Sequence, residues 1–193
     1  MILIPLALTI TSSQLNINSN KNLSSMRAYI ILLSLSLFFL KQTTAQASFS
    51  FEQEKKSQTS TVTVNVHSNS ETIWELITSS ENIPKWNSTI ISLAGEIEVG
   101  EKIALTSQMD PDKTFKLKVI EMVPNESMVW KGSGGLRTFS IKKATSGVTF
   151  TMSETIGGFM YPMYAKHLPD FESNFVQFAN DLKKAAEAKH HAH

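Results

Sequence analysis

The sequence of 193 residues contains no cysteine. This absence excludes disulfide frameworks, thiolate zinc sites, cysteine nucleophiles and a lipid-modified N-terminal cysteine. Residues 1–47 contain no acidic side chain, and their charged residues are Lys21, Arg27 and Lys41. The rest of the chain therefore has slightly more acidic than basic residues. A nucleic-acid binder needs many Lys and Arg side chains to displace counterions, so that class is disfavoured.

The apolar run Ala28–Leu40 (AYIILLSLSLFFL) is shorter than the roughly 20 residues that a membrane-spanning helix needs. It follows Arg27 and precedes a polar stretch that ends in Ala45-Gln46-Ala47. A positive start, a short apolar middle and a small-x-small site are typical of a secretory signal peptide. We therefore expect residues 1–47 to be an N-terminal extension and signal peptide, with Met26 as the start, cleavage after Ala47, and export to the periplasm or outside the cell. An uncleaved membrane anchor is the alternative.

The remaining chain divides into three parts. Residues 48–60 are polar without a clear period, so we expect a linker or a frayed N-terminal arm there. Residues 61–189 have the apolar patterns of one domain, and residues 190–193 form a histidine-rich tail. The tail has no carboxylate scaffold beside it, so we assign no metal site. No motif in the chain indicates a cofactor.

The patterns in residues 61–189 predict an α+β domain. Strict alternation over Thr61–His67 predicts a half-buried strand. The next residues, Ser68-Asn69-Ser70-Glu71, have the form of a capping box and predict the first of two short helices. Turn residues then divide residues 90–155 into about six further strands, with one of these turns at Asp110-Pro111-Asp112.

Apolar residues recur at helical spacing near the C-terminus, at Leu168, Phe171, Phe175, Phe178 and Leu182. This spacing predicts a long amphipathic helix with Pro169 in its first turn. A curved antiparallel sheet with one apolar face needs a cover, and this helix is the expected cover. The predicted fold is therefore a sheet of about six or seven strands wrapped around the C-terminal helix, with two short helices after the first strand.

Several residues occur in an order typical of one group of proteins: Trp74, Trp86 after a proline, Val119 before a Pro-Asn turn, Trp130 and Glu154-x-x-Gly157. Over residues 61–189 the sequence resembles the START and polyketide cyclase/dehydrase-like proteins of the SRPBCC, or helix-grip, superfamily. The resemblance implies an apolar cavity between the sheet and the C-terminal helix. Such a cavity would hold a small hydrophobic molecule: a lipid, isoprenoid, polyketide or aromatic compound. It implies no shared reaction, because members include carriers, sensors and enzymes.

Two opposite charges are expected to meet at the end of an apolar stripe. If Lys143 pairs with Val148, then Arg137 lies opposite Glu154 on the neighbouring strand. One interpretation is a polar anchor at the cavity mouth that orients a carbonyl, hydroxyl or carboxylate of a ligand. The other is a cross-strand salt bridge at the rim of the sheet. A bulge at Gly147 would separate the two residues and end both interpretations.

The predicted ligand-binding residues are Trp74, Trp86, Phe115, Leu117, Trp130, Arg137, Phe139, Phe150, Met152, Glu154, Phe159, Met163, Tyr164, His167, Phe171 and Phe175. For the apolar members of this set, a solidly packed core is the alternative. No catalytic residue is assigned, because the sequence shows no nucleophile with a base and an orienting partner.

Three functions follow from these patterns. The first is an exported carrier of a small hydrophobic molecule, with no nucleic-acid partner, no metal and no integral membrane segment after cleavage. The second is an enzyme of the cyclase, dehydratase or hydrolase type, with Glu154 or His167 as acid or base in the same cavity. The third is an interaction module with a filled core.

Overall fold

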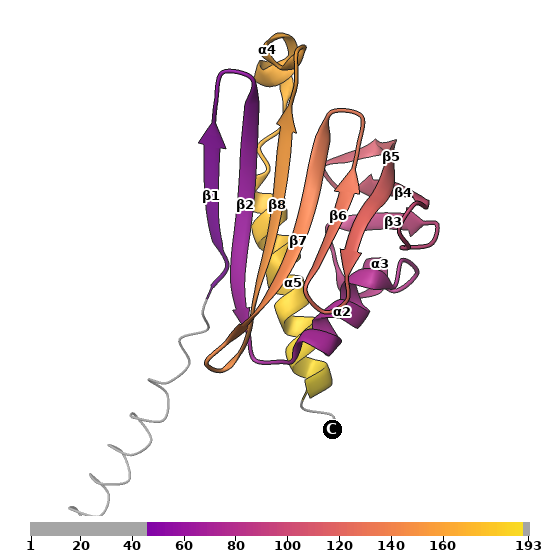
Figure 1. Cartoon of the computed structure of the whole chain (residues 1–193), viewed down its shortest axis with the longest axis vertical. Coiled ribbons are helices and arrows are strands. Elements are labelled where there is room, and N and C mark those ends of the chain that lie inside the picture. The colour runs from indigo at the N-terminus through magenta and orange to yellow at the C-terminus, as the bar shows by residue number, and fades with distance from the viewer. Residues whose placement is uncertain (1–45, 191–193) are drawn as a thin grey trace, which may run out of the picture. The chain divides into compact units, whose positions relative to one another are not determined.

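The computed structural model describes the backbone of residues 46–190 and the side chains as far as Lys189 (Figure 1). The predicted start at Met26, the apolar run Ala28–Leu40 and residues 191–193 of the tail lie outside the described residues. The described chain forms an antiparallel sheet of eight strands, in the order β1-β2-β8-β7-β6-β5-β4-β3. The strands are β1 (Ser48–Gln53), β2 (Ser57–Val66), β3 (Ile90–Ala94), β4 (Lys102–Ser107), β5 (Asp110–Val123), β6 (Ser127–Lys131), β7 (Gly135–Ala144) and β8 (Gly147–Gly157).

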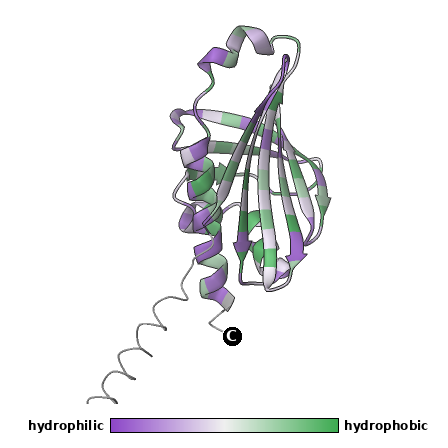
Figure 2. Ribbon diagram, turned by 90° about the vertical axis from the view of Figure 1, so that its left-hand side faces the viewer, coloured by the Kyte–Doolittle hydropathy of each residue, from purple (hydrophilic) through white to green (hydrophobic). Residues whose placement is uncertain are grey.

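Helices precede and follow the main run of strands. The helices are α2 (Ser70–Thr78), α3 (Ile83–Trp86), α4 (Tyr161–Tyr164), the 3-10 turn η1 (Ala165–His167) and α5 (Glu172–His190). Helix α5 packs against β2, and green apolar residues occur both on α5 and on the strands of the sheet (Figure 2). The predicted α+β fold, a curved antiparallel sheet with a long C-terminal helix and two short helices between the first strands and the meander, is confirmed.

Residues 48–60 are neither a linker nor a frayed arm in the structure, because they contain β1 and the start of β2. β1 pairs with β2 in register from Ser48 opposite Thr63 to Gln53 opposite Gln58. Its Phe49 is half-buried and meets the ring of Phe175 edge to face, with 6.4 Å between the ring centres. The sheet therefore has one strand more than the upper predicted number.

The first helix begins differently from the predicted capping box. Asn69 is the capping residue, and its Oδ1 accepts a hydrogen bond of 2.8 Å from the amide of Thr72. Glu71 instead accepts a bond from the hydroxyl of Ser70. The hydroxyl of Ser68 is buried without a partner in the described residues. Asn69, one residue later, thus caps the helix in place of the expected Ser68.

Two other predicted boundaries also shift. Asp110-Pro111-Asp112 is the start of β5 rather than a turn, and the turn itself falls at residues 108–109. Residues 110–117 pair with β4 alone among the described strands, and proline is tolerated on such a free edge. Helix α5 begins at Glu172, so Pro169 precedes it; the carboxylate of Asp170 accepts the amide of Glu172 at 2.9 Å.

The hydrophobic core lies between the sheet and α5. Val62, Val64 and Val66 on β2 are at most 2% exposed, which confirms the predicted inward face of that strand. From α5, Phe175 and Phe178 join this core. Burial of this apolar surface is the main source of the domain's stability.

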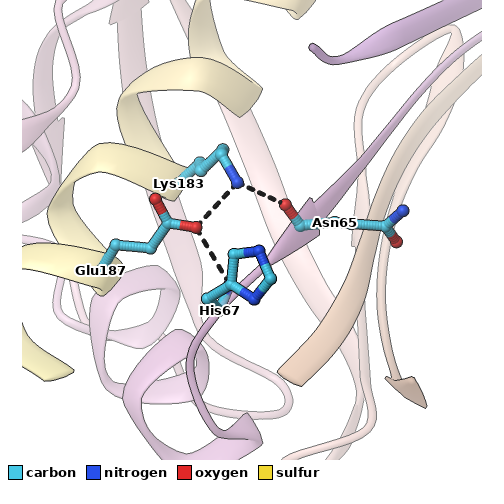
Figure 3. Close-up of polar contacts among 4 residues, drawn as sticks. All are labelled: Asn65, His67, Lys183 and Glu187. Atoms are coloured by element: carbon cyan, nitrogen blue, oxygen red, sulfur yellow. Dashed lines mark hydrogen bonds and ion pairs between the residues drawn. The ribbon is translucent and has the colours of Figure 1, made fainter. Parts of the chain in front are cut away.

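Polar contacts fasten the end of β2 to α5 (Figure 3). Lys183 Nζ donates to the carbonyl of Asn65 at 2.8 Å and to Glu187 Oε1 at 2.7 Å. The same carboxylate oxygen accepts the amide of His67 at 3.0 Å. Burial alone would raise the pKa of Glu187, but these hydrogen bonds and the charges of Lys183 and His67 outweigh it and hold the pKa below its ordinary value.

Candidate ligand-binding site

A pocket of about 420 Å³ opens between the sheet and the segment that leads into α5. Its wall on the sheet comes from β4 to β8, and the other wall is the stretch His167–Phe171. Side chains or backbone of the following residues line it: Leu105, Ser107, Met109, Asp110, Lys113, Phe115, Leu117, Trp130, Gly132, Gly135, Arg137, Glu154, Ile156, His167, Leu168, Pro169 and Phe171. A volume of this size is within the range of small-molecule sites.

The apolar wall follows from the alternation of the strands. Phe115 and Leu117 on β5 are half-buried while their neighbours Lys116 and Lys118 are exposed, as the period of two predicts. Here the wall faces the loop before α5 rather than the helix itself. The space between sheet and helix therefore stays open at this end of the molecule.

Arg137 and Glu154 lie opposite each other on β7 and β8, in the predicted register. Arg137 Nε donates to Glu154 Oε2 at 2.6 Å, and Nη2 contacts the same oxygen. The two side chains are 16% and 19% exposed, and the guanidinium lies 5.6 Å from the ring centre of Phe175. The register continues to Ala144 opposite Gly147, so the bulge that would have separated the pair does not occur.

The geometry of this pair leaves hydrogen-bonding capacity unused. Both contacts from Arg137 reach one oxygen of Glu154, and among the described residues no hydrogen bond reaches the other oxygen, Oε1. The pair is therefore neutral as a unit but still offers an acceptor at the pocket wall. The remaining N–H groups of the guanidinium are possible donors.

Trp130 adds a second unused group. It is 4% exposed, and its ring meets Phe139 at 4.8 Å between ring centres. Its indole Nε1 is buried and has no acceptor within the described part of the chain. A buried donor without a partner costs free energy. Sequence analysis named this residue as lining but gave no signal for the unpaired donor.

The structure sorts the predicted site residues into three groups, with Met163 outside all three. The pocket wall contains Phe115, Leu117, Trp130, Arg137, Glu154, His167 and Phe171. A wider open groove of about 720 Å³, which shares Phe115, Leu117 and Glu154 with the pocket, also contains Phe159 and Tyr164. Met163 lines neither and is 67% exposed.

The third group lies in packed regions, contrary to its predicted place in the cavity. Phe139, Phe150, Met152 and Phe175 are at most 1% exposed. The half-buried Trp74 and Trp86 pack against the core beside α5, and Trp86 meets Phe178 edge to face at 5.7 Å. Strand alternation gives core and pocket residues the same pattern, so it does not separate them. The residues that α5 covers belong to the core, and this contact cannot be read from the strands alone.

Sequence analysis missed Leu105, Met109, Ile156, Leu168 and Pro169 as lining residues. Ile156 had a signal, because it lies two positions after Glu154 on the same face of its strand. Leu168 and Pro169 had no such signal, because the helical pattern placed them within the C-terminal helix.

Glu154 and His167, the two candidate acid–base residues, both line the pocket. His167 is exposed, and no hydrogen bond joins it to Glu154 among residues 46–190. Tyr164 donates to the carbonyl of Gly157 at 3.4 Å. Within the same residues no group of three His, Cys, Asp or Glu side chains is placed to hold a metal ion, and no helix is long and apolar enough to span a membrane.

The order of strands, the two short helices and the long C-terminal helix define the helix-grip fold of the SRPBCC superfamily, which confirms the resemblance found in the sequence. A family model described as activator of Hsp90 ATPase homolog 1-like protein matches residues 67–187, so the chain belongs to this family. No curated protein matches the chain significantly in sequence.

Three solved structures illustrate the likeness in fold. EF2215 from Enterococcus faecalis, a conserved protein of unknown function, is 15% identical with a TM-score of 0.55, over 74% of this chain and 78% of that one. The di-domain aromatase/cyclase StfQ of steffimycin biosynthesis is 12% identical with a TM-score of 0.57, over 70% and 52%. The Aha1 dimer from Colwellia psychrerythraea is 16% identical with a TM-score of 0.51, over 66% and 94%. Identities this low carry the fold alone.

Proposed function

We propose that this protein is a carrier that binds a small, neutral, apolar molecule bearing a hydroxyl or carbonyl group. The observation that carries the proposal is the pocket of about 420 Å³, in which apolar walls surround an internally neutralised ion pair; its lining also includes Trp130, whose buried indole N–H is unpaired in the described residues. Apolar surface would supply the affinity, and the few polar groups would orient the ligand. Lipid alcohols, isoprenoids, polyketides and aromatic compounds all include molecules of this kind.

The preference for a neutral ligand follows from the charges. Glu154 already cancels the charge of Arg137, and at the rim Lys113 and Asp110 carry opposite charges. A ligand carboxylate would meet the free oxygen of Glu154 without a net positive charge to offset the repulsion. A ligand hydroxyl would donate to Glu154 Oε1, and one that displaces the side chains covering Trp130 Nε1 would also accept from that N–H.

A displacement assay with Nile red tests this proposal, using dodecan-1-ol and dodecanoate as matched ligands. Burial of about 300 Å² of apolar surface supplies roughly 7 kcal/mol before association costs, so we expect binding in the micromolar range at best. We expect the alcohol to bind about tenfold more tightly than the acid. Trp130→Phe should lower the affinity for the alcohol about three- to tenfold, because one hydrogen bond is lost.

Trp86→Phe is the matched control for this assay. The indole nitrogen of Trp86 is also buried without a partner in the described residues, but the residue does not line the pocket. Affinity for the alcohol should therefore stay unchanged in this variant. Failure of both ligands to displace Nile red, or equal effects of the two tryptophan variants, would contradict the proposal.

The enzymatic alternative uses the same residues. Glu154 is held in an ion pair by Arg137, which favours a binding role for this carboxylate over acid–base chemistry. Glu154→Gln separates the two functions, because it would abolish turnover in an enzyme but only change ligand preference in a carrier. If the wild type forms a reaction product in a cell extract, and Glu154→Gln binds the ligand equally well but forms no product, the enzyme is favoured.

Export is a further part of the proposal. It is supported by the position of the expected cleavage site, because a cut after Ala47 leaves β1, which begins at Ser48, complete. Intact-mass measurement of protein from the medium or periplasm of the natural host should give a chain that begins at Ser48. A chain with an intact N-terminus in the cytoplasmic fraction would rule export out.

A further inference from the structure

One end of the molecule carries uncovered apolar side chains. Phe159, Met160 and Met163 are 89%, 51% and 67% exposed. We call these three residues the apolar tip. Met163 is in α4 and the other two immediately precede it, and α4 projects beyond the end of the sheet (Figure 1). Exposed apolar residues that cluster in this way mark interaction surfaces.

The apolar tip is built onto the sheet and is not a loose loop. The amide of Gly158 donates to the carbonyl of Lys56 at 3.0 Å, and the amide of Gly157 donates to Gly134 at 3.1 Å. Tyr161 in α4 is 2% exposed, and its hydroxyl donates to Gln58 Oε1 at 3.0 Å. This tyrosine takes the inward position, so the apolar side chains around it are left facing solvent.

Lysines outnumber acids beside the apolar tip. Exposed lysines occur in the β1–β2 turn, at the end of β6 and in η1: Lys55, Lys56, Lys131 and Lys166. The acidic residues beside them are Glu52, Glu54 and Asp170. An apolar patch with neighbouring lysines complements a bilayer of anionic lipids, whose head groups attract lysine and whose acyl boundary accepts apolar side chains.

The apolar tip is also continuous with the ligand pocket. Phe159 and Met160 line the open groove that shares Phe115, Leu117 and Glu154 with the pocket. A bilayer in contact with the tip would therefore lie at the entrance to the pocket. An apolar ligand would then pass between the membrane and the protein with little exposure to water, which avoids the cost of hydrating its apolar surface.

We infer that this end of the protein docks on the surface of an anionic lipid bilayer, with the apolar tip in the interface and the four lysines at the head groups. This inference rests on exposure and charge at the tip and does not depend on which ligand the pocket selects.

Because the sequence has no cysteine, a single substitution gives one labelling site in the full chain. Met163→Cys carries an environment-sensitive NBD fluorophore at the tip, and Ser146→Cys carries it in the exposed turn between β7 and β8 at the opposite end of the sheet. With vesicles of phosphatidylcholine containing 30% phosphatidylglycerol, we expect emission from residue 163 to shift to the blue and rise several-fold. Emission from residue 146 should not change.

Charge variants of the labelled Met163→Cys chain test the lysines. Lys55→Glu with Lys56→Glu should weaken vesicle binding about tenfold or more, since each lysine near an anionic surface adds attraction. Lys142→Glu with Lys143→Glu makes the same change of charge beside the β7–β8 turn and should have little effect.

Three results would overturn the inference. No change at residue 163 would mean that the tip does not enter a bilayer. A response at residue 146 alone would mean that another part of the chain binds the vesicles. A blue shift at residue 163 that grows with protein concentration in the absence of lipid would mean that a second copy of the chain covers the tip.

Discussion

Phe139 and Phe159 show how the same residue type serves opposite purposes in this chain. Phe139 is 1% exposed and contacts the rings of Trp130, Phe150 and Phe178, with centre distances of 4.8 to 6.4 Å. Phe159 is 89% exposed. The first contributes its apolar surface to folding, whereas the second leaves it free for a partner.

We predict that Phe139→Ala lowers the free energy of unfolding by about 3–5 kcal/mol, because it removes buried surface and leaves a cavity among aromatic rings. Phe159→Ala should change stability by less than about 0.5 kcal/mol. Urea unfolding followed by circular dichroism measures both values. Equal losses of stability in the two variants would contradict the placement of these residues.

At the level of single residues, Arg137 shows what sequence analysis can predict and Trp130 shows what it cannot. The alternation of β7 and β8 was enough to predict that Arg137 meets Glu154, because register follows from pairing across a short turn. The unpaired nitrogen of Trp130 could not be predicted. Whether an indole finds an acceptor depends on every neighbour in three dimensions, and the sequence gives only those along the strand.

At the scale of elements, the junction of α5 with β2 depends on an ionised carboxylate, that of Glu187. Glu187 is lower in pKa than an ordinary carboxyl because, despite its burial, it accepts hydrogen bonds from Lys183 and from the amide of His67. A carboxyl whose pKa is lower in the folded state stabilises the fold above its unfolded-state pKa. That contribution is lost as the pH falls through the folded-state value.

We therefore predict that Glu187→Gln destabilises the protein more at pH 7 than at pH 3, since the wild type loses the same carboxylate charge on acidification. Urea unfolding at both pH values measures this difference. Glu75→Gln is the control, because the Glu75 carboxylate lies 3.6 Å from Lys189 and its side chain is 69% exposed. A loss of unfolding free energy in Glu187→Gln that is larger at pH 3 than at pH 7 would count against this account of the junction. So would a loss equal to that of Glu75→Gln at both pH values.

Strands and helices with one regular apolar face were predictable from the sequence. Elements that touch the core through only a few residues were not. The inward face of β2 and the stripe on α5 follow from periods of two and 3.6 residues. β1 escaped prediction because it is an edge strand whose residues are almost all exposed, with Phe49 as its main contact to the core. The start of α5 was placed too early because Leu168 and Phe171 continue its apolar spacing while the backbone at Pro169 is not helical.

At the scale of the whole molecule, the sheet is longer than the contact that α5 makes with it. Where the helix covers the sheet, aromatic side chains fill the interior, and a space between them measures about 10 Å³. Beyond the start of α5, at Glu172, the end of the sheet and the stretch His167–Phe171 line the pocket, and the apolar tip lies beside α4. Core and pocket are thus two parts of one apolar face of the sheet.

The proposed carrier function is tested most directly by native mass spectrometry of the protein purified from its own host without detergent. We predict a fraction of the protein whose mass exceeds that of the chain by one small molecule, which gentle collisional activation releases as a neutral species. Trp130→Phe should retain less of this molecule than Trp86→Phe. Protein that is always recovered at the mass of the bare chain, under conditions that preserve non-covalent complexes, would contradict the account.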